Sequence, residues 1–543
     1  MNLFEAIEAA SGRGSGITFR HPDGTEDEES VANLLVSASR GAIELQRSGV
    51  AAGDVVALVG PAGLDLVTAW LAVLRVGAVP TLMAPPNQRQ NAALWVAGMR
   101  HLASYTEASL VIVDGGVRPV IEAALGTADA APRLLDLANL LSTERTATTA
   151  PPLRLRPDEV VLLQHSSGTT GLHKGVALTS HALLTQVELY AEALQLDPSR
   201  DRIASWLPVY HDMGLIACLV LPLVTGTDII WVDNFEWARQ PGLLLDAIAR
   251  HRCTLCWLPN FAFHHLTSVA ADEAWDLASV RLWTNCSEPV KQHSFDGFVE
   301  RFRTCGVTEA ALGSSYALAE NTFAATQSIP GKAPRSRALP GDCRTTVTSS
   351  GHPLGRHEIE IRGADGKLMP EGEIGEIWLR TPCLMSGYFR RNAEALQDGW
   401  YGTGDLGLLD AGELFVCGRA RDMAIVAGKN VFPEDVESIL GQLDGLHPGR
   451  CVTFGVDDDD RGTQRLVALA EHSADTELDS KGRRALVRLA RNRVAEEIGA
   501  RLDELLIVGP NTLLKSSAGK LSRPRCRELY LSWGKANGGR KSP

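Results

Sequence analysis

The chain has 543 residues, of which 45% are hydrophobic and 22% charged, so it can form several domain-sized units with well-filled cores. Its formal net charge of −12 argues against nucleic acid or an anionic membrane surface as the main partner. The N-terminus lacks a basic stretch followed by an apolar one, so no secretion signal is expected.

The first 150 residues alternate helical and strand patterns. An amphipathic helix starts near Ala32, and a second helix is predicted over residues 64–76. Apolar runs at residues 54–60 and 78–82 indicate strands. Residues 144–157, which are rich in Thr, Ala and Pro, indicate a connection between two parts of the chain.

The alternation continues after this connection. Helical patterns separate predicted strands that centre near Ser205, Ile230, Cys256, Arg281 and Ala311. Strands and helices alternating at this spacing predict parallel sheets covered by helices, which is a doubly wound α/β architecture.

The most membrane-like stretch is residues 214–232. Pro222, Gly226 and Asp228 interrupt it, so it predicts a buried helix followed by a strand rather than membrane insertion.

The ten cysteines are scattered without a framework spacing, as expected for a reduced, cytoplasmic protein. Cys253 and Cys256 form a C-x-x-C pattern within an apolar run. A buried strand is favoured there over a redox or metal site, because no second Cys/His pair lies at zinc spacing.

From about residue 345 the pattern changes to short antiparallel strands, near residues 359–361, 374–379 and 414–416, which predict a small β-barrel-like part. A second unit begins near Arg421, with strands, a helix from Pro433 and a long helix to about Glu497. The predicted organisation is therefore a large α/β domain over residues 1–420 and a small α+β domain over residues 421–543. The polar residues from Ser532 onward are expected to be frayed.

A polar loop follows the apolar run at residues 160–163, which reads as a buried parallel strand, and precedes a helix with a predicted N-cap at Thr179 or Ser180. Glycines let the backbone turn its N–H groups toward a ligand, while hydroxyls and a Lys add donors and charge. The loop suits a polyphosphate, although Gly175 after Lys174 does not fit a Walker loop. A polar surface turn is the alternative. The candidate phosphate-binding residues are Ser166, Ser167, Gly168, Thr169, Thr170, Gly171 and Lys174.

Together with residues 205–215, 259–263 and 287–290, this loop resembles motifs of the adenylate-forming superfamily, in the same order along the chain. That superfamily includes acyl-CoA synthetases, fatty-acyl-AMP ligases, peptide-synthetase adenylation domains and luciferases. The likeness spans nearly the whole chain and is greatest for the acyl-CoA synthetase and fatty-acyl-AMP ligase branch.

The resemblance implies a two-step reaction in which a carboxylate attacks the α-phosphate of ATP and a thiol then displaces AMP from the acyl-adenylate. It implies ATP/AMP, Mg²⁺ and CoA as ligands, with a small-molecule carboxylic acid as the substrate. Both steps need fixed donors and cations where negative charge develops.

The resemblance also assigns roles to single residues. It matches Glu320 to a magnesium-associated carboxylate, Tyr316 to a residue that packs on adenine, and Asp405 to the ligand of the ribose hydroxyls. It matches Arg419 to a second nucleotide contact and Lys520 to the cation that reaches the α-phosphate during adenylation. Taken alone, each could be an ordinary turn, core or surface residue.

Two further positions are matched. Arg421 occupies the position of a hinge about which the C-terminal domain turns between the two steps. His211 lies where the superfamily places the entrance to the acyl pocket, so gating or packing is expected of it. Acid–base chemistry is not required, because a carboxylate is already ionised at neutral pH.

The nucleotide-pocket positions Cys286, Ser287 and Ala317 differ from the superfamily motifs, which have Gly where Cys286 and Ala317 stand. A new Cβ can crowd a ligand or forbid a positive φ. Either the substitutions are tolerated, or the ATP step is weakened and the enzyme accepts a preformed acyl-adenylate.

The acceptor is the last open point. Fatty-acyl-AMP ligases carry an extra segment after the motif that ends at Glu320, but only 31 positions separate Glu320 from Gly351. CoA is therefore favoured over an acyl carrier protein. An apolar acid is favoured over an amino acid, because no Asp matches the amino-group contact of amino-acid-activating relatives. The alternatives are a ligase that loads a carrier protein and an inactive relative that only binds nucleotide or acyl groups.

Overall fold

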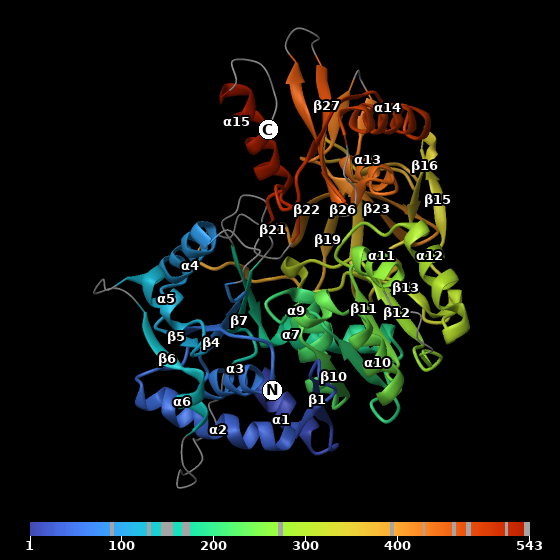
Figure 1. Ribbon diagram of the computed structural model, residues 1–543. Coiled ribbons are helices and arrows are strands. Elements are labelled where there is room, and N and C mark those ends of the chain that lie inside the picture. The colour runs from blue at the N-terminus through green and yellow to red at the C-terminus, as the bar shows by residue number, and fades with distance from the viewer. Residues whose placement is uncertain are drawn as a thin grey trace.

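The computed structural model describes residues 1–86, 92–126, 132–142, 156–165, 174–269, 275–340, 342–390, 396–426, 429–458, 463–473, 479–515 and 520–536. Two seven-stranded sheets form the N-terminal part, and smaller sheets follow toward the C-terminus. In Figure 1 the N-terminal part, in blue to green, lies below the orange and red C-terminal part.

The first seven-stranded sheet has the order β20-β8-β7-β4-β3-β5-β6 and is parallel from β7 to β6. Its strands are β3 (Val55–Val59), β4 (Val79–Met83), β5 (Leu110–Val113), β6 (Arg133–Asp136), β7 (Val160–His165), β8 (Gly175–Thr179) and β20 (Gly387–Tyr388). The helices in this part of the sequence are α2 (Val31–Arg47), α3 (Leu64–Val76), α4 (Ala92–Thr106), α5 (Arg118–Leu125) and α6 (Leu137–Leu141).

The second seven-stranded sheet has the order β13-β12-β11-β9-β10-β1-β2 and is parallel except for β2. Its strands are β1 (Gly16–Arg20), β2 (Glu26–Ser30), β9 (Arg202–Ser205), β10 (Asp228–Val232), β11 (Leu255–Leu258), β12 (Leu282–Asn285) and β13 (Leu312–Ser314). The α-helices of this part are α1 (Leu3–Ser11), α7 (Ser180–Ala193), α8 (Leu221–Thr225), α9 (Asn234–Arg239), α10 (Gly242–His251), α11 (Asn260–Val269) and α12 (Gln292–Phe302). A π-helix, η1 (Met213–Val220), and short 3₁₀ turns η2 (Arg303–Cys305), η3 (Glu309–Ala311) and η4 (Ala319–Asn321) complete it.

Helix α3 shows how the sequence builds this core. Its residues from Leu66 to Leu74 are all buried, and a helix that is apolar on every side belongs inside a protein. The helix ends at Gly77, whose φ of 79° is a left-handed cap that glycine adopts without strain. The parallel sheets and their covering helices confirm the predicted doubly wound α/β architecture.

The strands predicted after residue 345 are also present. They form an antiparallel sheet of β18 (Glu358–Arg362), β19 (Gly375–Arg380), β21 (Leu396–Gln397), β22 (Trp400–Asp410) and β23 (Glu413–Arg419). A hairpin of β15 (Ser336–Leu339) and β16 (Asp342–Thr348) contacts β23 through a bridge between Ser349 and Phe415. The remaining strand pair is β14 (Thr326–Gln327) with β17 (His352–Pro353).

Residues beyond Arg421 form an α+β arrangement with two apolar clusters that contain only residues from Ala424 onward. Its elements are β24 (Ala424–Val426), β25 (Lys429–Val431), α13 (Pro433–Leu440), β26 (Leu446–Asp458), β27 (Thr463–His472), α14 (Ser480–Glu497), β28 (Leu502–Val508) and α15 (Arg523–Ala536). These separate clusters support a boundary at residues 420/421, which stays a prediction.

Three sequence predictions need correction. Arg281 precedes β12 instead of centring a strand, because the pairing of β12 with β11 starts only at Leu282. Ala311 closes the 3₁₀ turn η3, and the strand pairing starts only at Leu312. Residues from Ser532 to Ala536 belong to helix α15, which buries Cys526 and Tyr530 on one face and is therefore held in place.

Two other predictions hold. Residues 214–232 form a buried helical segment, η1 with α8, followed by strand β10. Cys253 and Cys256 are both buried, and Cys256 lies in β11.

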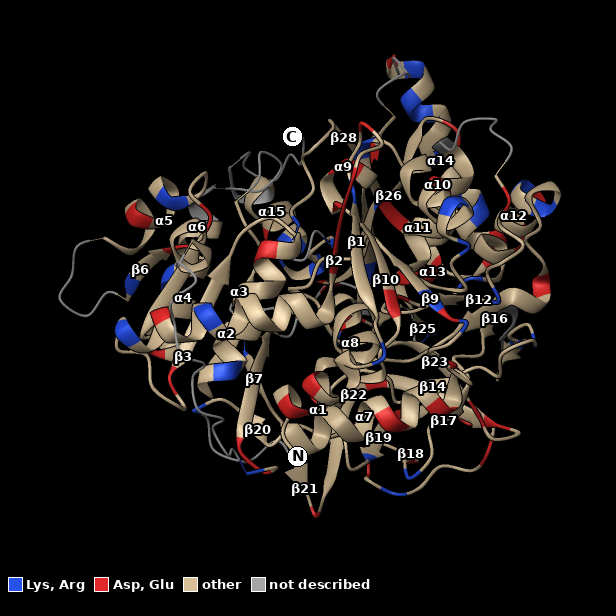
Figure 2. Ribbon diagram, turned by 90° about the horizontal axis from the view of Figure 1, so that it is seen from below, with Lys and Arg blue, Asp and Glu red and all other residues tan. Residues whose placement is uncertain are grey.

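Acidic and basic side chains lie on the same helices. Figure 2 shows both signs on α5 and on α12, which carry Arg118 with Glu122 and Arg301 with Asp296. None of the helices in the described part of the chain combines the length and apolar character that a membrane crossing requires.

Candidate active site

The predicted phosphate loop joins two antiparallel strands. Strand β7 ends at His165 and pairs with β8, which begins at Gly175 and leads into α7 with Thr179 as its N-cap. The loop is thus the connection of a hairpin at the edge of the parallel sheet, and the prediction of a direct strand-to-helix loop was wrong. The apolar run alone could not reveal that β7 has a parallel neighbour on one side and an antiparallel one on the other.

Residues 166–173 lie outside the described residues, and with them six predicted phosphate-binding positions: Ser166, Ser167, Gly168, Thr169, Thr170 and Gly171. The two ends of the loop are described. The His165 ring nitrogen Nε2 lies 2.6 Å from the Thr81 hydroxyl, and the Lys174 ammonium lies 4.8 Å from the centre of the Tyr388 ring. The loop therefore starts and ends beside fixed side chains.

Tyr388 also connects Lys174 to Glu320. The phenol donates to Glu320 Oε1 over 3.0 Å and lies 3.3 Å from the Tyr401 hydroxyl. Glu320 is half-buried in the turn η4, and this burial raises its pKa above the ordinary value. Sequence reasoning selected Lys174 and Glu320 but missed Tyr388. The antiparallel pairing of β20 with β8, which places it there, is not visible in the sequence.

Tyr316, Asp405 and Arg419 form a second cluster. The Tyr316 hydroxyl donates to Asp405 Oδ2 over 2.6 Å, and Arg419 Nε lies 3.2 Å from Asp405 Oδ1. The pairing of β22 with β23 places Asp405 directly opposite Arg419. Three residues predicted separately thus meet around one carboxylate. Arg421 follows on the exposed side, two residues after the end of β23.

The segment after β12 holds the two substituted positions. Cys286 is fully buried, and burial raises the pKa of its thiol to about 12. Neither Cys286 nor Ala317 has a positive φ, so the glycines of the superfamily motif are not needed here for backbone reasons. The residue with the left-handed backbone is Ser287, at φ 70°.

Lys520 reaches this segment from the C-terminal part of the chain. Its ammonium group donates to the Ser287 carbonyl over 2.8 Å. Asp212 lies near enough for Lys520 to oppose the rise that burial causes in its pKa, and the same holds for Glu288. A cation thus faces an acidic environment at the end of β12.

His211 lies in the turn before η1, with its ring centre 4.9 Å from that of Tyr210. The next residue, Asp212, accepts a hydrogen bond from the Met213 N–H over 2.8 Å and so caps η1. Every residue of η1 is buried. A buried π-helix is rare and often marks a functional site, and here it starts beside His211 and the Lys520 environment.

Glu320 suits a role in holding Mg²⁺ without a full set of protein ligands. Magnesium is commonly bound by one or two carboxylates together with substrate phosphates and water. The hydrogen-bond partner of Glu320 is a neutral phenol, and a cation bound beside this carboxylate would offset the cost that burial imposes on its charged form.

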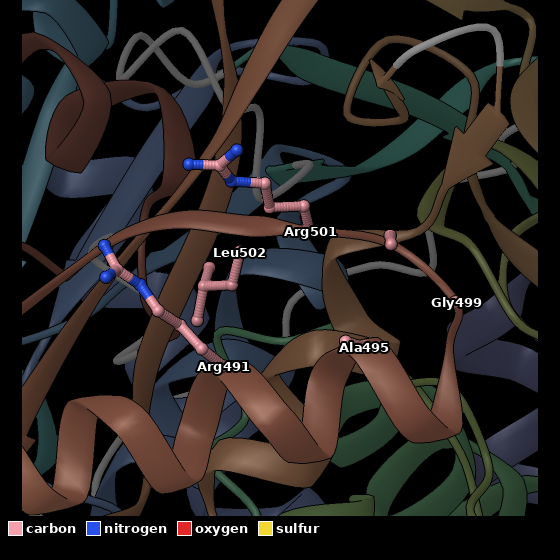
Figure 3. Close-up of a pocket in the computed structure, with 6 residues that line it drawn as sticks. Arg491, Ala495, Gly499, Arg501 and Leu502 are labelled. Carbon is pink, nitrogen blue, oxygen red and sulfur yellow. The ribbon is translucent and has the colours of Figure 1, made fainter.

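A separate hollow of about 440 Å³ lies on the C-terminal part, between the end of α14 and the start of β28. Figure 3 shows Arg491 and Arg501 at its side. Both guanidinium groups contact Asp503. Arg491 donates a hydrogen bond to the backbone carbonyl of Asp503, and Arg501 forms an ion pair with the Asp503 carboxylate. None of the predicted site residues lines this hollow, so we do not assign the reaction to it.

A model of the AMP-binding enzyme family matches residues 23–389, which is more than half of the chain. The chain belongs to the AMP-binding enzymes. This confirms the resemblance to the adenylate-forming superfamily and identifies the protein as an adenylate-forming ligase.

Relatives of this AMP-binding enzyme carry two kinds of name. It is 29% identical to a putative acyl-CoA synthetase of Caulobacter vibrioides over 509 residues, covering 89% of this chain and 87% of the relative. It is 28% identical to the long-chain-fatty-acid–AMP ligase FadD26 of Mycobacterium marinum, with 94% and 93% covered. Among solved structures, it matches a fatty acyl-adenylate ligase from work on E. coli and L. pneumophila with a TM-score of 0.91 at 26% identity, over 99% of both chains.

Proposed function

We propose that this AMP-binding enzyme activates an apolar carboxylic acid as an acyl-adenylate with ATP and then transfers the acyl group to the thiol of CoA. The observation that carries the proposal is the reach of Lys520 to Ser287, which places a cation from the end of the chain beside the predicted nucleotide positions.

In the first step, a carboxylate oxygen of the acid attacks the α-phosphate of ATP, and pyrophosphate leaves. The acid needs no general base because it is ionised at neutral pH. Lys520 stabilises the charge that develops on the α-phosphate, and Lys174 with the loop at residues 166–171 binds the β- and γ-phosphates. Glu320 would hold a magnesium ion together with the phosphates, and this ion would supply further positive charge to the phosphate oxygens.

The nucleoside is held by the second cluster. Asp405 accepts hydrogen bonds from the ribose hydroxyls, and Arg419 holds this carboxylate in place. Tyr316 packs on adenine while its hydroxyl orients Asp405 from the other side. The contact distances within this cluster, 2.6 and 3.2 Å, support a preformed ribose site.

In the second step, the thiolate of the acceptor attacks the acyl carbonyl, and AMP leaves with the bonding electron pair. Lys520 must then withdraw from Ser287 to make room, and we assign the turning point to Arg421. Because the C-terminal domain would turn about Arg421, we also place the boundary between the two domains at residues 420/421.

We assign the acid as apolar because the helix that follows His211, the predicted entrance of the acyl pocket, consists of apolar residues. Helix η1 after His211 contributes Met213, Leu215 and Ile216, all buried, and the Trp206 and Trp237 rings stack nearby at 3.5 Å. The relatives named as fatty-acid ligases support the same class. We assign His211 to the entrance of this pocket, as a gating or packing residue.

An acyl carrier protein is the second candidate acceptor. Relatives named as fatty-acyl-AMP ligases favour it, whereas the short interval between Glu320 and Gly351, partly filled by the hairpin β15–β16, favours CoA. Competition between CoA and a phosphopantetheinylated carrier protein for one acyl-adenylate tests this choice. Predominant acyl-CoA supports the proposal, and predominant acyl-carrier product replaces CoA by the second candidate.

The substituted positions are tested by restoring glycine in the variant Cys286→Gly/Ala317→Gly. Because neither residue has a positive φ, we expect the KM for ATP to change less than about threefold, which is below 1 kcal/mol. A large gain in ATP use would instead support an ATP step weakened by these side chains.

A further inference from the structure

The segment after β12 is held by the C-terminal part of the chain at two points. Lys520 donates to the Ser287 carbonyl over 2.8 Å. Four residues further on, the Lys291 ammonium forms an ion pair of 2.7 Å with Asp435, in the first turn of α13. In Figure 1, α13 lies above α11 and α12. The second contact has no part in the predicted chemistry.

On the N-terminal side, the segment is a fixed support. The Asn260 side-chain oxygen accepts hydrogen bonds from the Lys291 N–H at 3.2 Å and from the Asn285 amide at 3.0 Å. The Glu288 carboxylate accepts from the Phe261 N–H at 2.9 Å. Both ends of the segment are thereby tied to the start of α11, so Lys291 and Ser287 are held in fixed positions relative to each other.

On the C-terminal side, Arg523 connects the segments of the two residues that make these contacts, Lys520 and Asp435 of helix α13. It lies three residues after Lys520, at the start of α15, and its guanidinium is 3.0 Å from both Glu434 and Glu437 on α13. It also bonds Asp422, next to the proposed hinge, over 2.9 Å. The ion pairs of Arg523 therefore link the chain segment of Lys520 to helix α13, which carries Asp435.

The Lys291–Asp435 pair is shielded from water, unlike an ordinary surface pair. The two side chains are 18% and 15% exposed, compared with 83% and 57% for Lys367 and Asp365. Burial lowers the pKa of Lys291, but Asp435, followed by Glu434 and Glu437, outweighs this effect and raises it above the ordinary value. Removing one partner would leave a poorly solvated charge in the joined arrangement, so the loss of either partner disfavours that arrangement.

We propose that Lys291 and Asp435 are positioning residues for the adenylation step: their ion pair seats α13 on the segment after β12 and so holds Lys520 at Ser287. This inference rests on the proposed function, in which Lys520 serves the first step. The pair must separate before the thiol step. It therefore favours adenylate formation over thioester formation and sets the balance between them.

The test separates the two half-reactions. Adenylation is followed by ATP–pyrophosphate exchange with the best acid from a panel of straight-chain, aromatic and polycyclic carboxylates. Thioester formation is followed with the preformed adenylate of that acid and CoA. For Asp435→Asn, whose side chain keeps its size, we expect at least a tenfold lower exchange rate, a KM for ATP within threefold of the parent, and undiminished thioester formation.

The exchanged variant Lys291→Asp/Asp435→Lys restores an ion pair with reversed charges, and we expect it to recover most of the exchange rate lost by Asp435→Asn. The matched control Asp365→Asn removes an exposed pair and is expected to leave both half-reactions unchanged. Equal losses in both half-reactions, or no loss in Asp435→Asn, would overturn the inference. Absence of exchange in the parent enzyme with every acid would instead contradict the proposed function.

Discussion

The Lys520 ammonium group lies 2.8 Å from the carbonyl oxygen of Ser287, although 233 positions separate the two residues in the chain. The contact brings a cation from the C-terminal part of the chain to the place where negative charge develops in the proposed reaction. We expect Lys520→Ala to slow ATP–pyrophosphate exchange by on the order of 10²- to 10³-fold, as for loss of one preorganised electrostatic group. Thioester formation from a preformed adenylate should be largely kept, and equal loss of both activities would contradict this role.

Tyr316 and Asp405 give a second prediction. The phenol donates to the carboxylate over 2.6 Å, and a hydrogen bond to a charged group is worth about 1.5–3 kcal/mol. Tyr316→Phe keeps the ring but loses this bond. We expect the KM for ATP to rise at least tenfold while the KM for the acid stays nearly constant. A matched rise in both constants would show that the hydroxyl supports the whole site and not the ribose pocket alone.

Glu320 and Tyr388 give a third prediction, concerning magnesium. Glu320→Gln removes the charge proposed to hold Mg²⁺, so the Mg²⁺ concentration for half-maximal exchange should rise by about tenfold or more. Tyr388→Phe removes only the hydrogen bond of 3.0 Å to this carboxylate and should shift the same quantity less. A Mg²⁺ dependence unchanged in both variants would remove Glu320 from the proposed metal site.

A fourth prediction concerns stability. His357 is 8% exposed, with Nδ1 3.2 Å from the Ala325 carbonyl and Nε2 3.5 Å from the Cys383 sulfur. Burial lowers its pKa from 6.5 to about 4. Between these values the unfolded chain binds a proton that the folded protein does not, so stability falls as the pH falls through this window.

From pH 7 to pH 5 this one residue should cost about 2 kcal/mol of unfolding free energy. Denaturant unfolding of the parent and of His357→Gln at both pH values measures the effect. The variant should lose less stability between the two pH values than the parent does. An identical pH dependence in the two proteins would mean that His357 is charged or hydrated in the fold.

The sequence predicted the parallel core well, because fully buried strands and α3 carry long apolar runs that need no knowledge of their neighbours. It also located both carboxylates, Glu320 and Asp405, through their motifs. It did not reveal the hairpin of β7 and β8, since an apolar strand has the same pattern whether its neighbour is parallel or antiparallel. Tyr388 and the Lys291–Asp435 pair were missed for a related reason. They depend on contacts between distant segments, and no local pattern encodes such contacts.

Product analysis by mass spectrometry tests the central claim most directly. One mixture contains varied carboxylic acids, Mg-ATP and CoA, and the other contains preformed acyl-adenylates and CoA. The proposed function predicts acyl-CoA in both, with acyl-adenylate accumulating in the first when CoA is left out. Acyl-CoA from the preformed adenylates alone would contradict ATP-dependent activation by this enzyme.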